Sequence, residues 1–270
     1  MTRKNPLSVA TEAALAAGSV LMASYGKLKH SQISQKSRND FVTTLDKKSE
    51  ELIIRTLKKY FPGHSIQAEE SGLSRGEDAR WIIDPLDGTA NYIHRVPAFS
   101  VSIGFMEKGH MVAGVIYDPL HRELFQAQKG RGAFLNKKRI RVSPVPRLSD
   151  ALMATGIPFR ARGRFDQYLA SFEKISLASA GMRRLGSAAL DLAYVACGRF
   201  EGFWELNLSP WDIAAGALLI EEAGGRISDL WGTDAYLSNG DVLASNGRVH
   251  GELMAFTSGL FTPKPETPRP

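Results

Sequence analysis

The sequence contains one cysteine in 270 residues, so no disulfide can form within the chain. That residue, Cys197, lies in the apolar stretch LDLAYVACG, which is typical of a core position in a protein kept reduced, and this favours a cytoplasmic location. Internal repeats are absent, and no uninterrupted apolar run reaches the ~20 residues that a membrane-spanning helix needs. We therefore expect neither a disulfide scaffold, nor a solenoid, nor a membrane partner.

The amino-terminal segment has a basic start and a run of small residues, which is the pattern of a secretion signal. Glu12 interrupts this run. The apolar residues around it recur at helical spacing, at Leu7, Ala10, Ala14, Ala17, Leu21 and Met22. We therefore expect an amphipathic first helix and no targeting segment.

The bulk composition is that of a globular protein, with 43% hydrophobic and 23% charged residues. The formal net charge is +6 at pH 7. A net positive charge favours anionic ligands, and it is also compatible with acidic partners such as RNA. By itself it selects neither class.

The first half of the chain indicates helices followed by an antiparallel meander. NDFVTTLDKKSEELIIRTLKKYFPG (39–63) predicts a short strand that leads into a long helix. HSIQAEES (64–71) and WIIDPLDG (81–88) predict strands, and the apolar start of the second is typical of burial on both faces. Residues 99–143 predict several strands separated by turns.

The pattern changes at SPVPRLSD (143–150), where we place a domain boundary. Beyond it, predicted strands and helices alternate, which indicates an α/β arrangement. The strands are DALMATGIP and FEGFWEL, and the helices are FDQYLASFEKISLAS, SAALDLAYVACG and PWDIAAGALLIEEAGG. We expect an α+β half over residues 1–145, an α/β half over residues 146–261 and a disordered, proline-rich tail over residues 262–270.

Four carboxylates stand at the ends of predicted elements. Asp84 and Asp87 follow a buried strand, Glu69 follows another, and Asp212 begins a helix. Taken singly, these could be a strand end, a turn residue or a helix cap. Taken together, like charges beside a buried strand need a neutralising cation, and carboxylates are ligands that Mg²⁺ prefers.

The turn DPLDGTAN (84–91) suits both a cation and an anion. Pro85 stiffens it, Gly88 permits a close backbone approach, and the Leu86 carbonyl can point toward a metal. Thr89 falls in the first turn of the following helix, where free backbone N–H groups can hold a phosphate. A possible metal site and a possible phosphate site thus lie within a few residues of each other, which indicates phosphoryl chemistry.

WIIDPLDGTANYIH and WDIAAGALLIEEAGG resemble the two signatures of the inositol monophosphatase family. AEES, KSRNDFVTTLD and GSAALDLAYVACG are also similar to that family, so the likeness runs from about residue 7 to residue 260. It is greatest with the bacterial SuhB-type members. The resemblance implies an α/β protein built as a layered αβαβα sandwich, with two or three Mg²⁺ ions in a cleft between the halves.

The resemblance also implies roles for individual residues. The metal ligands would be Glu69, Asp84, the Leu86 carbonyl, Asp87 and Asp212. The catalytic groups would be Thr89 and Asp46, which orient and deprotonate the attacking water, together with Glu69. The amides of Gly88 and Thr89 would hold the phosphate, and the polyol hydroxyls would contact Asp87, Ala188 through its backbone, Glu205 and Asp212. Lys36 would lie on a loop that closes over the third metal.

The implied reaction is hydrolysis of inositol 1-phosphate and related polyol phosphates, with inhibition by lithium. Fructose-1,6-bisphosphatases and nucleotide-bisphosphate phosphatases share the Asp-Pro-x-Asp-Gly core and remain alternatives. A second phosphate would need basic residues in the cleft, whereas NKKRIR (136–141) is expected in a solvent-facing hairpin, so we rank these substrates lower. His94 sits in the first signature, and we expect it to be structural.

A non-enzymatic function also follows from the resemblance. SuhB-type members join ribosomal RNA antitermination complexes, which implies Nus factors, RNA polymerase and leader RNA as partners. Arg183, Arg184 and FRARGRF (159–165) are compatible with such contacts, although no recognised RNA-binding motif is present. The resemblance further implies a homodimer, with Arg184 near its interface.

Overall fold

The computed structural model describes residues 4–37, 40–159 and 161–262, without the side chains of residues 30 and 35–40. The α-helices are α1 (Pro6–Ser24), α2 (Thr44–Tyr60), α3 (Thr89–His94), α4 (Phe165–Ala178), α5 (Ala188–Ala196), α6 (Pro210–Glu222), α7 (Tyr236–Asn239) and α8 (His250–Ser258). Short 3₁₀ helices are η1 (His30–Gln32), η2 (Leu148–Asp150) and η3 (Arg162–Arg164). The predicted tail is outside this description from residue 263 onward.

The strands form a hairpin and two larger sheets. The hairpin pairs β1 (Ile33–Ser37) with β2 (Asp40–Thr43). The eight-stranded sheet contains β3 (His64–Ala68), β4 (Gly72–Ser74), β5 (Glu77–Asp87), β6 (Ser100–Glu107), β7 (His110–Asp118), β8 (Glu123–Gln128), β9 (Gly132–Leu135) and β10 (Lys138–Ile140). The five-stranded sheet contains β11 (Leu152–Thr155), β12 (Gly181–Arg183), β13 (Gly202–Glu205), β14 (Arg226–Ser228) and β15 (Val242–Ser245).

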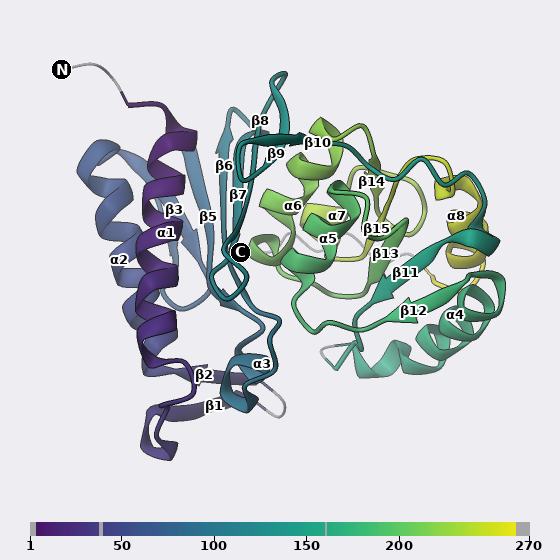
Figure 1. Ribbon diagram of the computed structural model, residues 1–270, viewed down its shortest axis with the longest axis horizontal. Coiled ribbons are helices and arrows are strands. Elements are labelled where there is room, and N and C mark those ends of the chain that lie inside the picture. The colour runs from purple at the N-terminus through teal and green to yellow at the C-terminus, as the bar shows by residue number, and fades with distance from the viewer. Residues whose placement is uncertain (1–3, 38–39, 160, 263–270) are drawn as a thin grey trace.

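The elements stack in five layers (Figure 1). Helices α1 and α2 cover one face of the eight-stranded sheet, and α5 and α6 lie between the two sheets. Helices α4 and α8 cover the outer face of the five-stranded sheet. The predicted layered αβαβα sandwich is confirmed.

The register of the large sheet brings two distant carboxylates together. The strand order is β10-β9-β8-β7-β6-β5-β3-β4, and β5 to β10 are antiparallel neighbours, as the meander pattern predicted. Strand β3 instead runs parallel to β5, with Ala68 opposite Ile83. Because both strands end at the same edge, Glu69 emerges beside Asp84.

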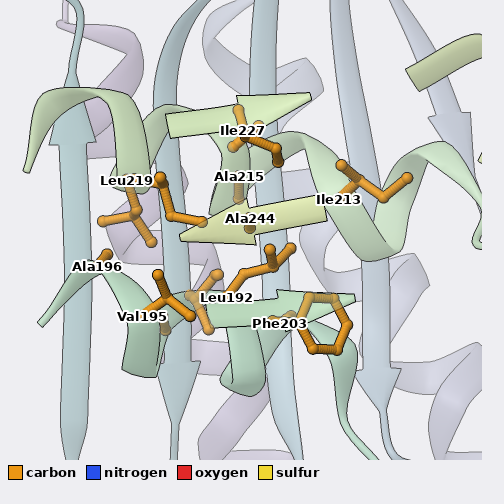
Figure 2. Packing of buried hydrophobic residues seen from close by; sticks show 14 of the residues in the cluster. Leu192, Val195, Ala196, Phe203, Ile213, Ala215, Leu219, Ile227 and Ala244 are labelled. Atoms are coloured by element: carbon orange, nitrogen blue, oxygen red, sulfur yellow. The ribbon is translucent and has the colours of Figure 1, made fainter. Parts of the chain in front are cut away.

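The helices between the sheets share one hydrophobic core with both sheets. Figure 2 shows Leu192 and Val195 of α5 and Leu219 of α6 packed with side chains of the small sheet, including Phe203. The same cluster contains Ile116 of the large sheet. This core contains residues from both sides of the predicted boundary at residue 145. The division into residues 1–145 and 146–261 stays a prediction.

Helix α6 lies against two glycines of the large sheet. Gly104 and Gly114 face each other in the register of β6 and β7. A Cβ added to Gly104 would lie 3.0 Å from the Ala214 Cβ, and one added to Gly114 would lie 2.9 Å from the Ala215 carbonyl oxygen. The missing side chains let the helix approach the sheet closely, which carries Asp212, near its start, to the edge where β5 ends.

Helix α1 is long and apolar enough to cross a bilayer by length and composition alone. Its Val9, Ala13 and Leu21 are fully buried, however, and the helix packs against α2, β6 and β7. The predicted amphipathic first helix is therefore a core helix of the sandwich.

Candidate active site

One pocket collects nearly all of the predicted site residues. It is lined by residues that follow β3, by the end of β5 with the start of α3, by the segments after β11 and at the end of β13, and by the starts of α5 and α6. The predicted residues among them are Glu69, Asp84, Leu86, Asp87, Gly88, Thr89, Ala188, Glu205 and Asp212. Asp46 lies behind this lining and reaches it through Thr89. Lys36 falls in β1, and its side chain is outside the described residues.

Three carboxylates from two distant segments converge in the pocket. Asp84, Asp87 and Asp212 each offer an oxygen, and these oxygens lie within 4.8 Å of one another. Burial raises the pKa of Asp84 well above its usual value, and the nearby charges of Glu69, Asp87 and Asp212 raise it further. Burial, followed by repulsion from Asp212, raises the pKa of Asp87 to about 7. Three ionised carboxylates at these distances repel one another, and a divalent cation bound between them would offset that repulsion.

The DPLDG turn is fixed by hydrogen bonds from its own chain and from α2. The Leu86 N–H donates to Asp84 Oδ1 at 2.9 Å, and Ser49 Oγ donates to the Pro85 carbonyl at 3.0 Å. Gly88 has φ +88°, and a Cβ there would lie 2.9 Å from the Ala98 carbonyl oxygen. The position needs glycine both for its left-handed backbone and for the close approach.

Asp87 is held by the start of α5. Its Oδ2 accepts hydrogen bonds from Ser187 Oγ at 2.5 Å and from the Ala189 N–H at 2.8 Å. Both bonds favour the charged carboxylate and oppose the effect of burial on its pKa. The Ser187 hydroxyl therefore contacts a predicted metal ligand directly.

Asp212 lies in the first turn of α6, at the helix start that the sequence predicted. It is the third residue of α6, and its Oδ2 accepts the N–H of Ser209, the N-cap residue, at 2.7 Å. This is one half of a capping box, so the cap and the pocket use the same side chain.

Glu69 is positioned by a residue that the sequence did not reveal. Glu50 of α2 is 3% exposed, and its two oxygens accept the N–H groups of Glu70 and Ser71 at 2.8 Å each. The Glu69 N–H donates to the Ile83 carbonyl at 3.2 Å. The backbone that carries Glu69 is thus held on both sides. A signal existed, because Glu50 shares the buried face of α2 with Ile53 and Leu57.

Thr89 and Asp46 form a hydrogen-bonded pair. Thr89 Oγ1 lies 3.0 Å from Asp46 Oδ1 and 3.0 Å from the Leu86 carbonyl oxygen. The other Asp46 oxygen accepts the N–H of Thr43 at 2.8 Å and its hydroxyl at 2.5 Å. Burial raises the pKa of Asp46 to about 6, against the opposing effect of these bonds.

Glu205 sits across the pocket at the end of β13. A Cβ added to Gly156 would lie 1.9 Å from its carboxyl carbon, so a larger residue at position 156 would force the Glu205 carboxylate to move. Asp191 of α5 is fully buried, and burial, with repulsion from Glu205, raises its pKa well above the usual value. Among the described residues that line the pocket, Arg184 alone has a basic side chain, and its guanidinium lies 5.8 Å from the Phe159 ring centroid.

Comparison with known proteins shows the family of the chain. The sequence profile of the inositol monophosphatase family matches residues 3–259. The chain belongs to the inositol monophosphatase family. It is therefore a phosphatase.

Named relatives cover nearly the whole chain. It is 45% identical over 256 residues to an inositol-1-monophosphatase of Mesorhizobium japonicum, covering 94% of this chain and 96% of the relative. It is 46% identical over 251 residues to the Nus factor SuhB of Escherichia coli K12, covering 92% and 94%. The crystal structure of the suhB protein of Bartonella henselae superposes with a TM-score of 0.90 at 42% identity, covering 93% and 97%.

Proposed function

We propose that the chain is a Mg²⁺-dependent phosphomonoesterase that hydrolyses inositol 1-phosphate and related polyol phosphates to the free alcohol and phosphate. The observation that carries this proposal is the convergence of Asp84, Asp87 and Asp212 in one pocket, with oxygens within 4.8 Å of one another. Family membership supports a phosphatase, and the donor set fits hard cations.

The proposed ligands for two or three Mg²⁺ ions are Glu69, Asp84, the Leu86 carbonyl, Asp87 and Asp212. All of these residues line the pocket. Bound Mg²⁺ would neutralise the carboxylates, offset charge on the phosphoryl oxygens and lower the pKa of a water molecule. Lithium inhibition, with Li⁺ in a vacated site, and a role for Lys36 over the third site belong to the same proposal.

The attacking water would lose its proton to the Thr89–Asp46 pair. Thr89 Oγ1 donates to Asp46 Oδ1, which leaves an oxygen lone pair free to accept a hydrogen bond from the water. Asp46 then takes the hydroxyl proton as Thr89 accepts one. An aspartate whose pKa is about 6 can accept this proton near neutral pH.

The amides of Gly88 and Thr89 would bind the phosphate, and the opposite wall would bind the alcohol. The proposed polyol contacts are Asp87, the Ala188 backbone, Glu205 and Asp212, all of which line the pocket. Carboxylates accept hydrogen bonds from hydroxyl groups, which suits a polyol better than an apolar alcohol.

The test is phosphate release from inositol 1-phosphate by the purified protein with and without Mg²⁺. We expect Mg²⁺-dependent turnover, and we expect Asp84→Asn to abolish it. Asp78→Asn, at an exposed residue of β5, is the matched control and should keep wild-type activity. Full activity of Asp84→Asn would remove the metal assignment.

Bisphosphate substrates are less well supported. Lys137 and Lys138 are exposed in the β9–β10 hairpin, and neither lines the pocket. Assays with fructose 1,6-bisphosphate and 3′-phosphoadenosine 5′-phosphate decide between the alternatives. Higher kcat/KM for either than for inositol 1-phosphate would overturn the polyol assignment.

A second proposed function is binding to the transcription machinery in ribosomal RNA antitermination. The relatives named Nus factor SuhB carry this proposal, together with the net charge of +6. The proposed partners are Nus factors, RNA polymerase and ribosomal leader RNA, and the proposed location is the cytoplasm. We expect salt-dependent retention of one of them on the immobilised protein, and no retention at low salt would contradict the proposal.

We further propose a homodimer formed through α4. Phe165, Leu169 and Phe172 lie at i, i+4 and i+7 on this helix, and each is more than a third exposed. Such an apolar stripe is typical of a protein interface. We expect light scattering to give a dimer and Leu169→Glu to give a monomer. A monomeric wild-type protein at micromolar concentration would contradict the proposal.

A further inference from the structure

Two loops form the wall of the pocket that faces the proposed alcohol group. One follows β11 and contributes Gly156 to Phe159, and the other follows β13 and contributes Glu205 to Leu208. The two strands are parallel neighbours, with Thr155 opposite Trp204. Because parallel strands end at the same edge of a sheet, both loops leave the sheet side by side, and a contact beyond the strands can fix their separation.

A buried ion pair supplies that contact. Arg164, at the end of the first loop, donates from Nη1 to Asp241 Oδ2 at 2.6 Å. The side chains are 15% and 0% exposed. The other Asp241 oxygen, Oδ1, accepts the N–H of Asn207 at 3.0 Å. One carboxylate therefore joins the first loop to the backbone of the second.

Neighbouring contacts support the same arrangement. The Leu208 N–H donates to the Gly240 carbonyl at 2.7 Å, next to Asp241. Asn207 has φ +59°, a left-handed conformation that asparagine adopts more readily than most other residues with a side chain. On the first loop, the Ala161 N–H donates to the Pro158 carbonyl at 3.0 Å, and the Arg164 N–H donates to the Ala161 carbonyl at 2.9 Å. Consecutive turns thus link the pocket residue Pro158 to Arg164.

The Arg164 guanidinium is enclosed by aromatic rings. It lies 5.1 Å from the Phe261 ring centroid and 5.9 Å from that of Trp231. Among the described residues, no acceptor bonds its Nε or Nη2. Burial of a cation is costly, and Asp241 and the two rings are the groups that compensate it. The guanidinium therefore has a single strong anchor, which fixes the end of the first loop relative to the second.

We propose that the Arg164–Asp241 ion pair is a positioning device that sets the spacing between the two loops and so determines which alcohol the pocket accepts. The inference rests on the proposed phosphatase function and deepens it. Neither residue lines the pocket, so both act through the two loops, of which the first carries Pro158 and the second carries Leu208. The phosphate and metal side, built from β5 and the starts of α3, α5 and α6, keeps its geometry when the pair is broken.

The first experiment compares two substrates in Arg164→Met, Asp241→Asn and the double variant. Inositol 1-phosphate carries hydroxyls for the alcohol wall, whereas p-nitrophenyl phosphate carries none. We expect KM for inositol 1-phosphate to rise by about 10- to 100-fold, as misplaced binding groups produce. The kcat values, the Mg²⁺ dependence and KM for p-nitrophenyl phosphate should change by less than about threefold, and Arg164→Lys should recover part of the loss.

The matched control is Arg199→Met, which breaks the ion pair between Arg199, after α5, and Glu123 of β8, neither of which lines the pocket. A general loss of stability would change the kinetic constants of all the variants in the same way, and it would do so for both substrates. Equal loss for both substrates, or an unchanged KM for inositol 1-phosphate in Arg164→Met, would overturn the inference.

The second experiment does not depend on turnover. Hydrogen exchange of the Asn207 and Leu208 amides should accelerate by at least about tenfold in Arg164→Met and stay unchanged in Arg199→Met. Unchanged exchange in Arg164→Met overturns the inference even if the wild-type protein proves inactive. An inactive wild-type protein with accelerated exchange would contradict the proposed function and leave the loop contact supported.

Discussion

Thr89 and Asp46 are joined by a hydrogen bond, although 43 residues separate them in the chain. In the proposed mechanism this bond would make the hydroxyl an oriented proton carrier, because Asp46 would take the hydroxyl proton while Thr89 Oγ1 accepts one from the water. Both residues came from the family resemblance, since a buried aspartate near a helix start is more often only a cap. Asp46 is in fact such a cap as well, since it accepts the Thr43 N–H.

The first prediction concerns the Thr89 hydroxyl. Thr89→Val keeps the shape of the side chain but removes the proton carrier, and we expect kcat to fall by about 10²- to 10⁴-fold. Thr89→Ser keeps the hydroxyl and should stay within about tenfold of the wild type. Steady-state phosphate release measures both. Similar kcat values for the valine and serine variants would show that the hydroxyl has no catalytic role.

The second prediction concerns Glu50, which holds the backbone next to Glu69. Glu50→Gln keeps one acceptor and loses the other together with the charge. The Mg²⁺ concentration for half-maximal activity should rise by about 10- to 100-fold, as for other residues that orient metal ligands. Glu51→Gln, at the exposed neighbouring position, is the control and should leave it unchanged. An unchanged Mg²⁺ requirement in Glu50→Gln would contradict this role.

The sequence identified Asp84, Asp87 and Thr89 because they stand together in one short motif. Glu69 was predicted from its position after a strand, and Asp212 from its position at a helix start within the second signature. Glu50, Gly156 and Arg164 could not be assigned in this way, since their roles depend on which distant backbone each one meets. Only the three-dimensional packing places Gly156 against Glu205, or Arg164 against Asp241.

At the scale of the elements, the end of the chain was the least predictable part. The strands β14 and β15 and helix α8 had no separate prediction, although the helices α5 and α6 did. The strand β14 has three residues and β15 has four, which is too short for a periodic pattern to stand out. The parallel pairing of β3 with β5 also needs the tertiary structure, whereas the antiparallel meander is suggested by turns in the sequence.

His250 joins α8 to β14 and β15 and carries a prediction at this scale. Its Nε2 lies 2.9 Å from Ser228 Oγ, and its Nδ1 lies 3.0 Å from Ser245 Oγ. Ser228 Oγ donates to the Asp229 carbonyl, so it accepts from Nε2–H, and Nδ1 accepts from Ser245. The ring is therefore held in its neutral form, and burial lowers its pKa to about 4.

The sign of the pH effect follows from that shift. Between pH 6.5 and pH 4 the unfolded chain binds the proton and the folded chain does not, so folding stability falls as the pH is lowered through this window. The loss reaches about 3 kcal/mol below pH 4. Urea unfolding from pH 7 to pH 4 measures it in the wild type and in His250→Gln. The variant should be less stable than the wild type at pH 7, and its free energy of unfolding should fall less between pH 7 and pH 4. If the free energies of unfolding of the two proteins changed in parallel with pH, the account would be contradicted.

At the scale of the whole molecule, the site is where three layers meet. The large sheet supplies Asp84 and Asp87, the middle helices supply Asp212 and the Ser187 hydroxyl, and the small sheet supplies Glu205. Because the proposed ligands come from more than one layer, metal binding would be coupled to the assembly of the layers. The layered arrangement was predictable from the family signatures, and the loops of the alcohol wall were not.

This coupling predicts a pH-dependent stabilisation by Mg²⁺. The pKa of Asp87 is raised to about 7 in the metal-free protein, so folding without metal becomes less favourable as the pH rises from about 4 through 7. Mg²⁺ binds the deprotonated carboxylates and removes that penalty. The rise in Tm on adding Mg²⁺ should be larger at pH 8 than at pH 5.5, and it should be much smaller in Asp212→Asn. A Tm rise that is equal at both pH values would contradict the prediction.

The central claim is that carboxylates from separate layers hold divalent cations in one pocket. Crystals grown with Mn²⁺ in place of Mg²⁺ test it most directly, because anomalous scattering locates the ion without reference to activity. The account predicts anomalous peaks within about 2.0–2.4 Å of oxygens of Asp84, Asp87 and Asp212. No peak among these three side chains at saturating Mn²⁺ would contradict it.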